Sequence, residues 1–154
     1  MTGAKIGGCT DGGGDFRTVT LTNATITASF QGANFNGIDF SSITLSSGTN
    51  SAQFYAQSDL ANTNFSGRQL GNVAFYNSNL AGADFSNSEL NGTAFGEATV
   101  TNTNFSNSHF VNVYFIGTDL TTANISGATW SNTLCPDTTN SDDNGGTCLG
   151  HLVP

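Results

Sequence analysis

This 154-residue chain has very few charged side chains, and almost all of them are acidic. Charged residues make up 9% of the sequence, far below the share in an ordinary soluble domain. Three bases, Lys5, Arg17 and Arg68, stand against eleven acids, which gives a formal net charge of −8 at pH 7. Proteins bind nucleic acid by neutralising its phosphates with Lys and Arg. The composition therefore argues against a nucleic-acid partner.

Long apolar runs are also missing. No stretch of the sequence approaches the ~20 consecutive apolar residues that a membrane-spanning helix needs, so we expect no membrane insertion. The opening residues MTGAK are not followed by an apolar segment, so we expect no signal peptide within this chain.

The residue patterns of catalytic centres are absent as well. Neither His109 nor His151 has a Cys or a carboxylate at the spacing of a metal site or a catalytic triad, so we interpret both as surface residues. The many Ser residues have no accompanying base that would make them nucleophiles. There is no phosphate-binding loop and no paired-carboxylate motif. We therefore predict that the chain is not an enzyme and has no firm cofactor.

What the chain has in abundance is a large apolar residue at every fifth position. This period fits neither an α-helix nor a flat strand, and it identifies an internal repeat. Two positions before each centre stands a small or modest side chain, such as Ala33, Ala83 or Ala123. Asn50 is a polar residue at one of these central positions, but the five-residue spacing continues through it. The centres are Phe30, Phe35, Phe40, Leu45, Tyr55, Leu60, Phe65, Leu70, Phe75, Leu80, Phe85, Leu90, Phe95, Val100, Phe105, Phe110, Phe115, Leu120, Ile125 and Trp130.

Units such as ANFNG (33–37), ADFSN (83–87) and ANISG (123–127) resemble the A-[D/N]-[L/F]-x-x unit of the pentapeptide-repeat family. The resemblance implies an all-β fold, a right-handed quadrilateral β-helix with four pentapeptides in each coil. The central residue of each unit and the residue two before it would point inward. At this length the repeat would form about five coils.

The repeat divides the chain into three predicted segments. Residues 1–29 form a Gly-rich arm and a capping strand or coil, because apolar residues alternate with Thr between Asp15 and Phe30. Residues 30–134 form the β-helix. Residues 135–154, where the period fails, form a C-terminal tail.

Taking every fourth unit from Leu45 places similar residues on one side of the coil. The ten residues from Leu45 to Tyr55 leave no room for an insertion, so we expect this register to hold throughout. Asn or Asp would precede the centres and Ser would follow them. The predicted polar ladder contains Ser46, Asn64, Ser66, Asp84, Ser86, Asn104, Ser106, Asn124 and Ser126.

A second side, with centres Phe35, Tyr55, Phe75, Phe95 and Phe115, carries apolar residues outward instead. An uncharged wall of aromatic and aliphatic residues is typical of a contact surface. We predict that it binds another protein or a second copy of this chain. The alternative is scattered surface aromatics, which are normal. The candidate residues are Phe54, Tyr76, Tyr114 and Ile116, with Val111 at the preceding corner.

The tail contains Cys135 and Cys148 around twelve polar residues. A local disulfide is the simplest interpretation, and closing such a loop would contribute about 3 kcal/mol. Disulfides persist in oxidising compartments, which favours an extracellular, cell-surface or periplasmic protein over a cytoplasmic one. The family resemblance adds that Cys-flanked tails end some secreted members. Cys9 remains, either free or paired between chains.

The same loop follows the opening of an EF-hand calcium loop at Asn140, Asp142 and Asn144. The twelfth position is His151, where a bidentate Glu is needed, and no helical pattern flanks the loop. A weak Ca²⁺ site and an ordinary Asx-rich turn are the two interpretations.

The function favoured by these features is a structural and protein-interaction module. One alternative, taken from the family, is a protein that protects DNA gyrase by resembling duplex DNA. However, the repeat carries six acids against Arg68, whereas duplex DNA of similar length carries about fourteen charges. A second alternative is a surface that orders water, ice or glycan through the polar ladder.

Overall fold

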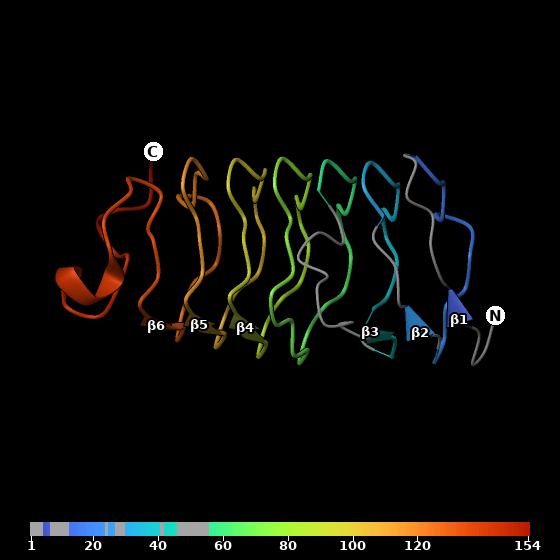
Figure 1. The fold of residues 1–154 in the computed structure, drawn as a ribbon, viewed down its shortest axis with the longest axis horizontal. Coiled ribbons are helices and arrows are strands. Elements are labelled where there is room, and N and C mark those ends of the chain that lie inside the picture. The colour runs from blue at the N-terminus through green and yellow to red at the C-terminus, as the bar shows by residue number, and fades with distance from the viewer. Residues whose placement is uncertain (1–4, 7–12, 24, 27–29, 41, 46–55) are drawn as a thin grey trace.

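The computed structural model describes residues 5–6, 13–23, 25–26, 30–40, 42–45 and 56–154. They form an elongated stack of coils, with the 3-10 helix η1 (Ser141–Asn144) at the C-terminal end (Figure 1). Two parallel sheets run along the stack, in the orders β1-β2-β3 and β4-β5-β6. Their strands are β1 (Lys5–Ile6), β2 (Thr25–Ile26), β3 (Thr44–Leu45), β4 (Glu89–Asn91), β5 (His109–Val111) and β6 (Thr129–Ser131).

Each coil takes twenty residues in the second half of the chain. Parallel bridges join Asp84 to Asn104 and Asn104 to Asn124. The backbone N–H of Phe85 donates to the carbonyl of Asn104 at 2.7 Å, and the N–H of Asn104 donates to the carbonyl of Ala83 at 2.9 Å. Four pentapeptides therefore complete one circuit, and each circuit satisfies the backbone of its neighbour.

The central residues fill the interior, as expected. Phe85 is fully buried and stacks between Phe65 and Phe105, with ring centroids 4.8 and 5.3 Å away. Phe75, from the opposite side of the coil, meets Phe85 edge to face at 5.6 Å. Such stacked and edge-on pairs add to the stabilisation that burial alone provides.

The second inward position also holds polar side chains, and these are hydrogen-bonded. The hydroxyl of Thr103 donates to the carbonyl of Leu80 at 2.8 Å. Ser108 makes the same bond to Phe85 at 2.7 Å. A buried hydroxyl without a partner would cost about 1–3 kcal/mol, so these bonds allow Ser and Thr inside the coil. Arg68 stands at the same position, and its guanidinium donates to the carbonyl of Ile43.

Most of the described pentapeptides end in a corner that has a left-handed backbone. The residue two after the centre has a positive φ, for example 57° at Asn87 and 56° at Asn107. Asn and Gly adopt this conformation more readily than other residues. The chain then turns, and the N–H of Ala83 donates to the carbonyl of Leu80 at 3.0 Å across the previous corner. This explains why Asn and Gly recur at that position.

The expected twenty-residue register fails between the first part of the stack and the rest. Parallel bridges join Asp39 to Asn64, twenty-five residues apart, and the Phe40 ring stacks on Phe65 at 4.5 Å. The predicted stacking of Leu45 beneath Phe65 is therefore wrong, and so is the prediction that no insertion occurs. Almost every unit has a large apolar residue at its centre, so the sequence does not show where a coil takes one unit more.

Two other predictions are affected by this change of register. The N–H of Phe35 donates to the carbonyl of Asp59, so Phe35 lies in the column of Leu60 and not on the predicted apolar side. Ser46, Asn50 and Phe54 lie outside the described residues.

The N-terminal segment contributes to the stack rather than forming one long strand. Asp15 bridges Asn34 in parallel, and the Phe16 ring stacks on Phe35 at 4.6 Å. Of the predicted strand over 15–30, β2 is the part that pairs on both edges, with β1 and β3.

Candidate interaction surface

The candidate surface, called the aromatic side below, is built on the buried column of Phe75, Phe95 and Phe115. Residues flanking these centres point outward because side chains alternate along an extended segment. Parallel bridges align Ala74 with Ala94, Ala94 with Tyr114, and Tyr114 with Leu134. The aromatic side comprises Ala74, Tyr76, Ala94, Gly96, Tyr114 and Ile116.

Tyr76 lies directly over Gly96 in the next coil. A Cβ atom on Gly96 would come within 2.7 Å of Cε1 of the Tyr76 ring and within 3.4 Å of the Ile116 carbonyl oxygen. The absence of a side chain at Gly96 therefore lets the tyrosine ring rest against the wall. Tyr76 remains 42% exposed, and Tyr114 and Ile116 are 41% and 40% exposed. Large apolar side chains this exposed are otherwise confined, among the described residues, to Leu149 and Val153 in the tail.

A shallow depression of about 200 Å³ lies between Tyr76 and Tyr114. Its floor contains Ala74 and Ala94, which are buried although they point outward. The small side chains of the floor and the large ones at its margins create the hollow. The residues lining it are Asn72, Val73, Ala74, Tyr76, Gly92, Ala94 and Tyr114.

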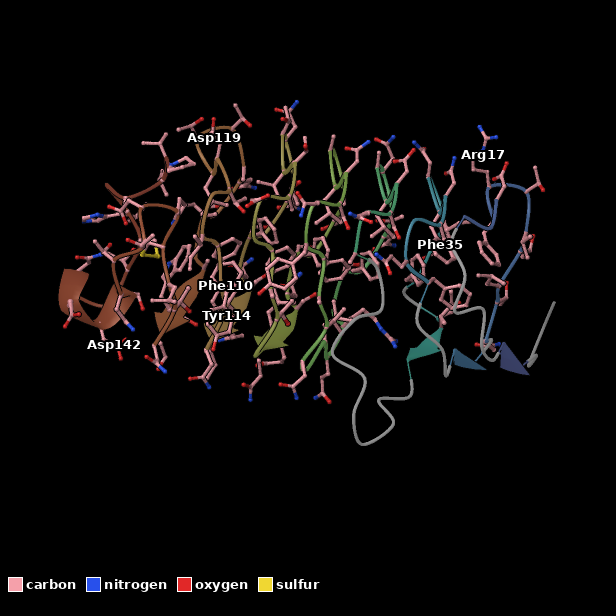
Figure 2. All side chains as sticks on the ribbon, turned by 45° about the horizontal axis from the view of Figure 1, so that its top comes forward. Arg17, Phe35, Phe110, Tyr114, Asp119 and Asp142 are labelled. Atoms are coloured by element: carbon pink, nitrogen blue, oxygen red, sulfur yellow. A yellow bond between two sulfur atoms is a disulfide. The ribbon has the colours of Figure 1, made fainter. Side chains whose placement is uncertain are left out.

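The structure thus brings two of the predicted contact residues, Tyr76 and Tyr114, to one depression, with Ile116 beside Gly96. Val111 lies in β5 on the neighbouring side, half-buried and paired with Asn91 and Ser131. It does not line the depression. Tyr114 appears in Figure 2.

The predicted polar ladder from Asn64 onward lies on the opposite side of the coil. The N–H of Ser86 donates to Oδ1 of Asp84 at 2.8 Å, and the N–H of Ser106 donates to Oδ1 of Asn104 at 3.1 Å. The amide of Asn104 donates to Asp84 in the coil below, also at 3.1 Å. The pairs Asn64–Ser66 and Asn124–Ser126 repeat the local bond. Much of the ladder's hydrogen-bonding capacity is therefore used within the protein.

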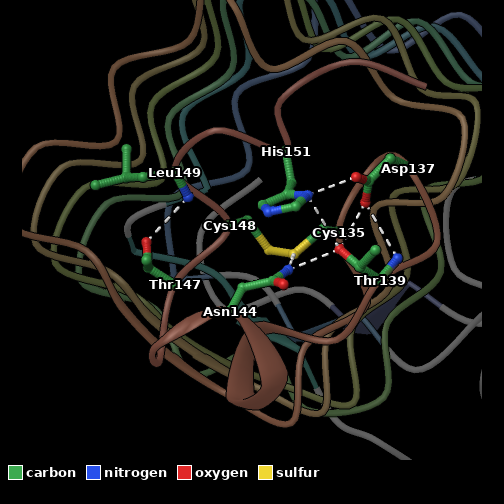
Figure 3. A network of polar contacts seen from close by, with 8 residues as sticks. All are labelled: Cys135, Asp137, Thr139, Asn144, Thr147, Cys148, Leu149 and His151. Carbon is green, nitrogen blue, oxygen red and sulfur yellow. Dashed lines mark hydrogen bonds and ion pairs between the residues drawn. A yellow bond between two sulfur atoms is a disulfide. The ribbon is translucent and has the colours of Figure 1, made fainter.

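Cys135 and Cys148 are bonded and fully buried in the tail, with Cα atoms 5.5 Å apart. Around them runs a polar network (Figure 3). His151 Nδ1 lies 2.6 Å from Oδ2 of Asp137, and the Thr139 hydroxyl donates to Oδ1 of Asp137 at 2.7 Å. His151, which the sequence placed at the surface, has a side chain that is 33% exposed and bonded to Asp137. His109 is exposed, with Nδ1 2.9 Å from the Thr129 hydroxyl.

The Asp137 carboxylate is held in its ionised form. The hydroxyl of Thr139, followed by His151, lowers the pKa of Asp137 from 3.8 to about 2. Hydrogen bonds to the charged form of a carboxyl group have this effect. Further along the chain, the N–H of Leu120 donates to the carbonyl of Leu152 at 2.8 Å. The tail is therefore tied to the last coil on both sides of its disulfide.

The three residues of the calcium motif have other contacts in the structure. Oδ1 of Asn140 accepts the N–H of Asp142 at 3.0 Å and caps η1. Oδ1 of Asp142 accepts the N–H of Asn132 at 2.8 Å, and the Asn144 amide donates to the Thr139 hydroxyl at 2.7 Å. These bonds place the three side chains in a capped 3-10 turn.

Within the described residues, no group of three or more His, Cys, Asp or Glu side chains is arranged to hold a metal ion. No helix in this part of the chain is long and apolar enough to cross a membrane.

Sequence reasoning missed Gly92 and Asn72 as lining residues, and it missed the contact between Asp137 and His151. Gly96 was visible in the sequence as a small residue, and its missing side chain leaves room for the Tyr76 ring. Nothing in the spacing of Asp137 and His151 indicated their contact, because the tail follows no period.

Comparison with known proteins identifies the repeat. A family model described as a pentapeptide repeat region matches residues 50–125. No curated protein sequence matches the chain significantly.

Among solved structures, the chain is similar to a pentapeptide repeat protein from the Arabidopsis thaliana thylakoid lumen. That protein is 22% identical, with a TM-score of 0.44, and the match covers 92% of this chain and 78% of that one. It is also similar to HetL, a pentapeptide repeat protein involved in heterocyst differentiation regulation in the cyanobacterium Nostoc sp. strain PCC 7120. The identity is 21%, the TM-score 0.37, and the coverage 91% of this chain and 63% of that one.

A trypsin-treated form of QnrB1, a plasmid-mediated fluoroquinolone resistance protein, is 17% identical, with a TM-score of 0.30. That match covers 82% of this chain and 74% of the other. The matched family model and the five-residue units stacked in twenty-residue coils agree, and residues 50–125 of this chain form a region of the pentapeptide-repeat family.

Proposed function

We propose that this protein is a non-enzymatic interaction module, a rigid β-helical rod that binds a protein partner through its aromatic side. The observation that carries this proposal is the exposure of Tyr76, Tyr114 and Ile116, 40–42% each, on one side of the coil. Contiguous exposed aromatics of this kind are enriched at protein interfaces. The partner is another protein or a second copy of this chain.

The polar ladder, on the opposite side of the coil, is the weaker candidate for a binding surface. A surface that orders water, ice or glycan needs hydrogen-bonding groups that are available to solvent. In the polar ladder, the oxygens of Asp84 and Asn104 already accept backbone and amide N–H groups. The hydroxyls of Ser66 and Ser126 donate to Asn64 and Asn124 at 2.7 and 2.8 Å. The hydrogen bonds of the polar ladder therefore mainly stabilise the coils themselves.

The proposal also includes the handedness of the β-helix, its number of coils and the roles of its two ends. We expect a right-handed helix with about five coils over residues 30–134, preceded by the cap of residues 1–29. The tail, residues 135–154, closes the C-terminal end. Its disulfide favours an oxidising compartment, which is extracellular, cell-surface or periplasmic.

Calcium is not needed in this proposal. The oxygens of Asn140 and Asp142 that a calcium ion would need accept N–H groups of Asp142 and Asn132. We expect millimolar Ca²⁺ to leave the melting temperature unchanged, whereas Ca²⁺-dependent stabilisation would restore the calcium interpretation.

Two measurements test the interaction function. Sedimentation over a wide concentration range reports self-association, with Tyr76→Asp/Tyr114→Asp as the test variant. The matched control is Ser86→Asp/Ser106→Asp, which adds the same charge on the polar ladder. Because all four positions are on the surface, both variants should fold.

For a different partner, a photo-crosslinking residue is placed at position 114 or, as the control, at position 104. A specific adduct from position 114 that the tyrosine double variant loses, with or without self-association, supports the proposal. Equal adducts from both positions, together with a monomer at all concentrations, would overturn it.

A further inference from the structure

The part of the chain that carries the aromatic side has an acidic net charge, although the residues that line the depression are uncharged. Residues 56–154 contain eight acids and one base, Arg68. Arg68 does not offset this charge at the surface of the aromatic side, because it occupies an inward position and donates to the carbonyl of Ile43. Arg17 lies toward the N-terminal end of the stack, away from Tyr114 (Figure 2), and is ion-paired with Asp15 at 2.7 Å.

This charge distribution discriminates between possible occupants of the depression. A second copy would bring together two chains of the same negative net charge, and like charges oppose association. Nucleic acid and anionic lipid are disfavoured for the same reason. A cationic partner is attracted by the field of the whole repeat region.

The depression has the chemistry to hold a cation without a charged residue of its own. Tyr76 and Tyr114 border it, and the faces of aromatic rings attract cations through their quadrupole. Neither tyrosine hydroxyl bonds to any of the described residues, so both remain available. The side-chain oxygen of Asn72 lies above Gly92, 2.5 Å from the position of a hypothetical Cβ there. It can accept an N–H from a ligand.

We infer that the depression between Tyr76 and Tyr114 takes an arginine side chain from a basic segment of a partner protein. This inference rests on the proposed interaction function and names the partner's chemistry. The planar guanidinium stacks on aromatic faces and offers five donors in a fixed fork. Its N–H groups reach the Asn72 oxygen and the tyrosine hydroxyls, while the alkyl stem covers the floor of Ala74 and Ala94.

The test is an NMR titration of ¹⁵N-labelled full-length protein with the blocked peptide Gly-Arg-Gly-Arg-Gly. The same peptide with citrulline in place of arginine keeps the shape and removes the charge. A third peptide with proline in place of arginine tests an apolar occupant. We expect the arginine peptide to shift the amide signals of Ala74, Gly92 and Ala94, and not those of Ser86 and Ser106. The effect should weaken at high ionic strength.

Tyr114→Leu and Tyr114→Phe form a matched pair of variants. Leucine removes the ring, and binding should weaken roughly two- to fivefold, whereas phenylalanine retains the ring and most of the affinity. Equal binding of the citrulline peptide, stronger binding of the proline peptide, or shifts confined to the polar ladder would overturn the arginine assignment.

The outcomes separate the two proposals. If position 114 still yields a specific crosslink or the protein self-associates, but the arginine peptide does not bind, the inference about arginine fails alone. If neither experiment shows binding at the aromatic side, the proposed interaction function fails as well.

Discussion

The side-chain oxygen of Asn62 lies 2.7 Å from the point that a Cβ atom on Gly82 would occupy, one coil further along. The same relationship joins Asn72 to Gly92 at 2.5 Å and Asn107 to Gly127 at 2.4 Å. At these corners an asparagine in one coil is thus accommodated by a glycine in the next. The glycine is required twice, by its positive φ and by the space that it leaves.

Gly82→Ala and Gly67→Ala separate these two requirements. Both glycines have φ of 68°, but a Cβ on Gly67 would meet nothing within 4 Å. Gly67→Ala should cost about 1–2 kcal/mol from backbone strain alone, and Gly82→Ala should cost more because Asn62 must move. Urea unfolding measures both losses. Equal losses would show that the contact with Asn62 does not matter.

The aromatic stack predicts that the stability of the fold depends strongly on Phe85, which is fully buried between Phe65 and Phe105. Phe85→Ala should lower the free energy of unfolding by about 3–5 kcal/mol. Phe85→Asp should prevent folding, because it places a charge inside the stack. Ser86→Ala, on the surface, should stay within about 0.5 kcal/mol. Circular dichroism and denaturation test these values, and a folded Phe85→Asp protein would contradict the solenoid core.

Stability of the tail should depend on pH through Asp137. Its folded pKa is about 2, lowered from 3.8 chiefly by the Thr139 hydroxyl and then by His151. A lowered pKa means that the folded state favours the ionised carboxylate. The stabilisation is therefore complete above about pH 4 and is lost as the pH falls through about 2.

Asp137→Asn should accordingly accelerate hydrogen exchange in the tail at pH 6, and its difference from the unmodified protein should vanish below about pH 2. Asp143→Asn removes the same charge from an exposed position in the same tail and should have little effect. If the two variants behave alike, the Asp137–His151 contact does not secure the tail.

The bond between Cys135 and Cys148 is predicted to form in the native protein. Peptide mapping of material isolated without reductant should recover a crosslinked pair, tested in a Cys9→Ser background so that no other thiol competes. Replacing both tail cysteines by serine should lower stability by about 3 kcal/mol. Two free thiols in native material would remove the argument for an oxidising compartment.

Much of the candidate site was accessible from the sequence. Tyr76, Tyr114 and Ile116 were predicted to share one side because they flank centres twenty residues apart, and that spacing holds from the bridge between Asp59 and Asn79 onward. Val111 was assigned to the same surface but lies in β5, between Asn91 and Ser131. The depression itself was not foreseen, since its shape depends on how Tyr76 and Tyr114 lie over Gly96 and Ala94.

The sequence by itself determined the five-residue unit, its inward centre and its left-handed corner. These are local properties: alternation of side chains sets which residues face inward, and Asn or Gly tolerates the positive φ. The tertiary structure decided which units stack. Phe40, not Leu45, lies beneath Phe65, and His151 reaches Asp137 across the disulfide. Such contacts join residues fourteen to twenty-five positions apart, so they depend on how many units close each coil and on where the tail packs, which no single unit encodes.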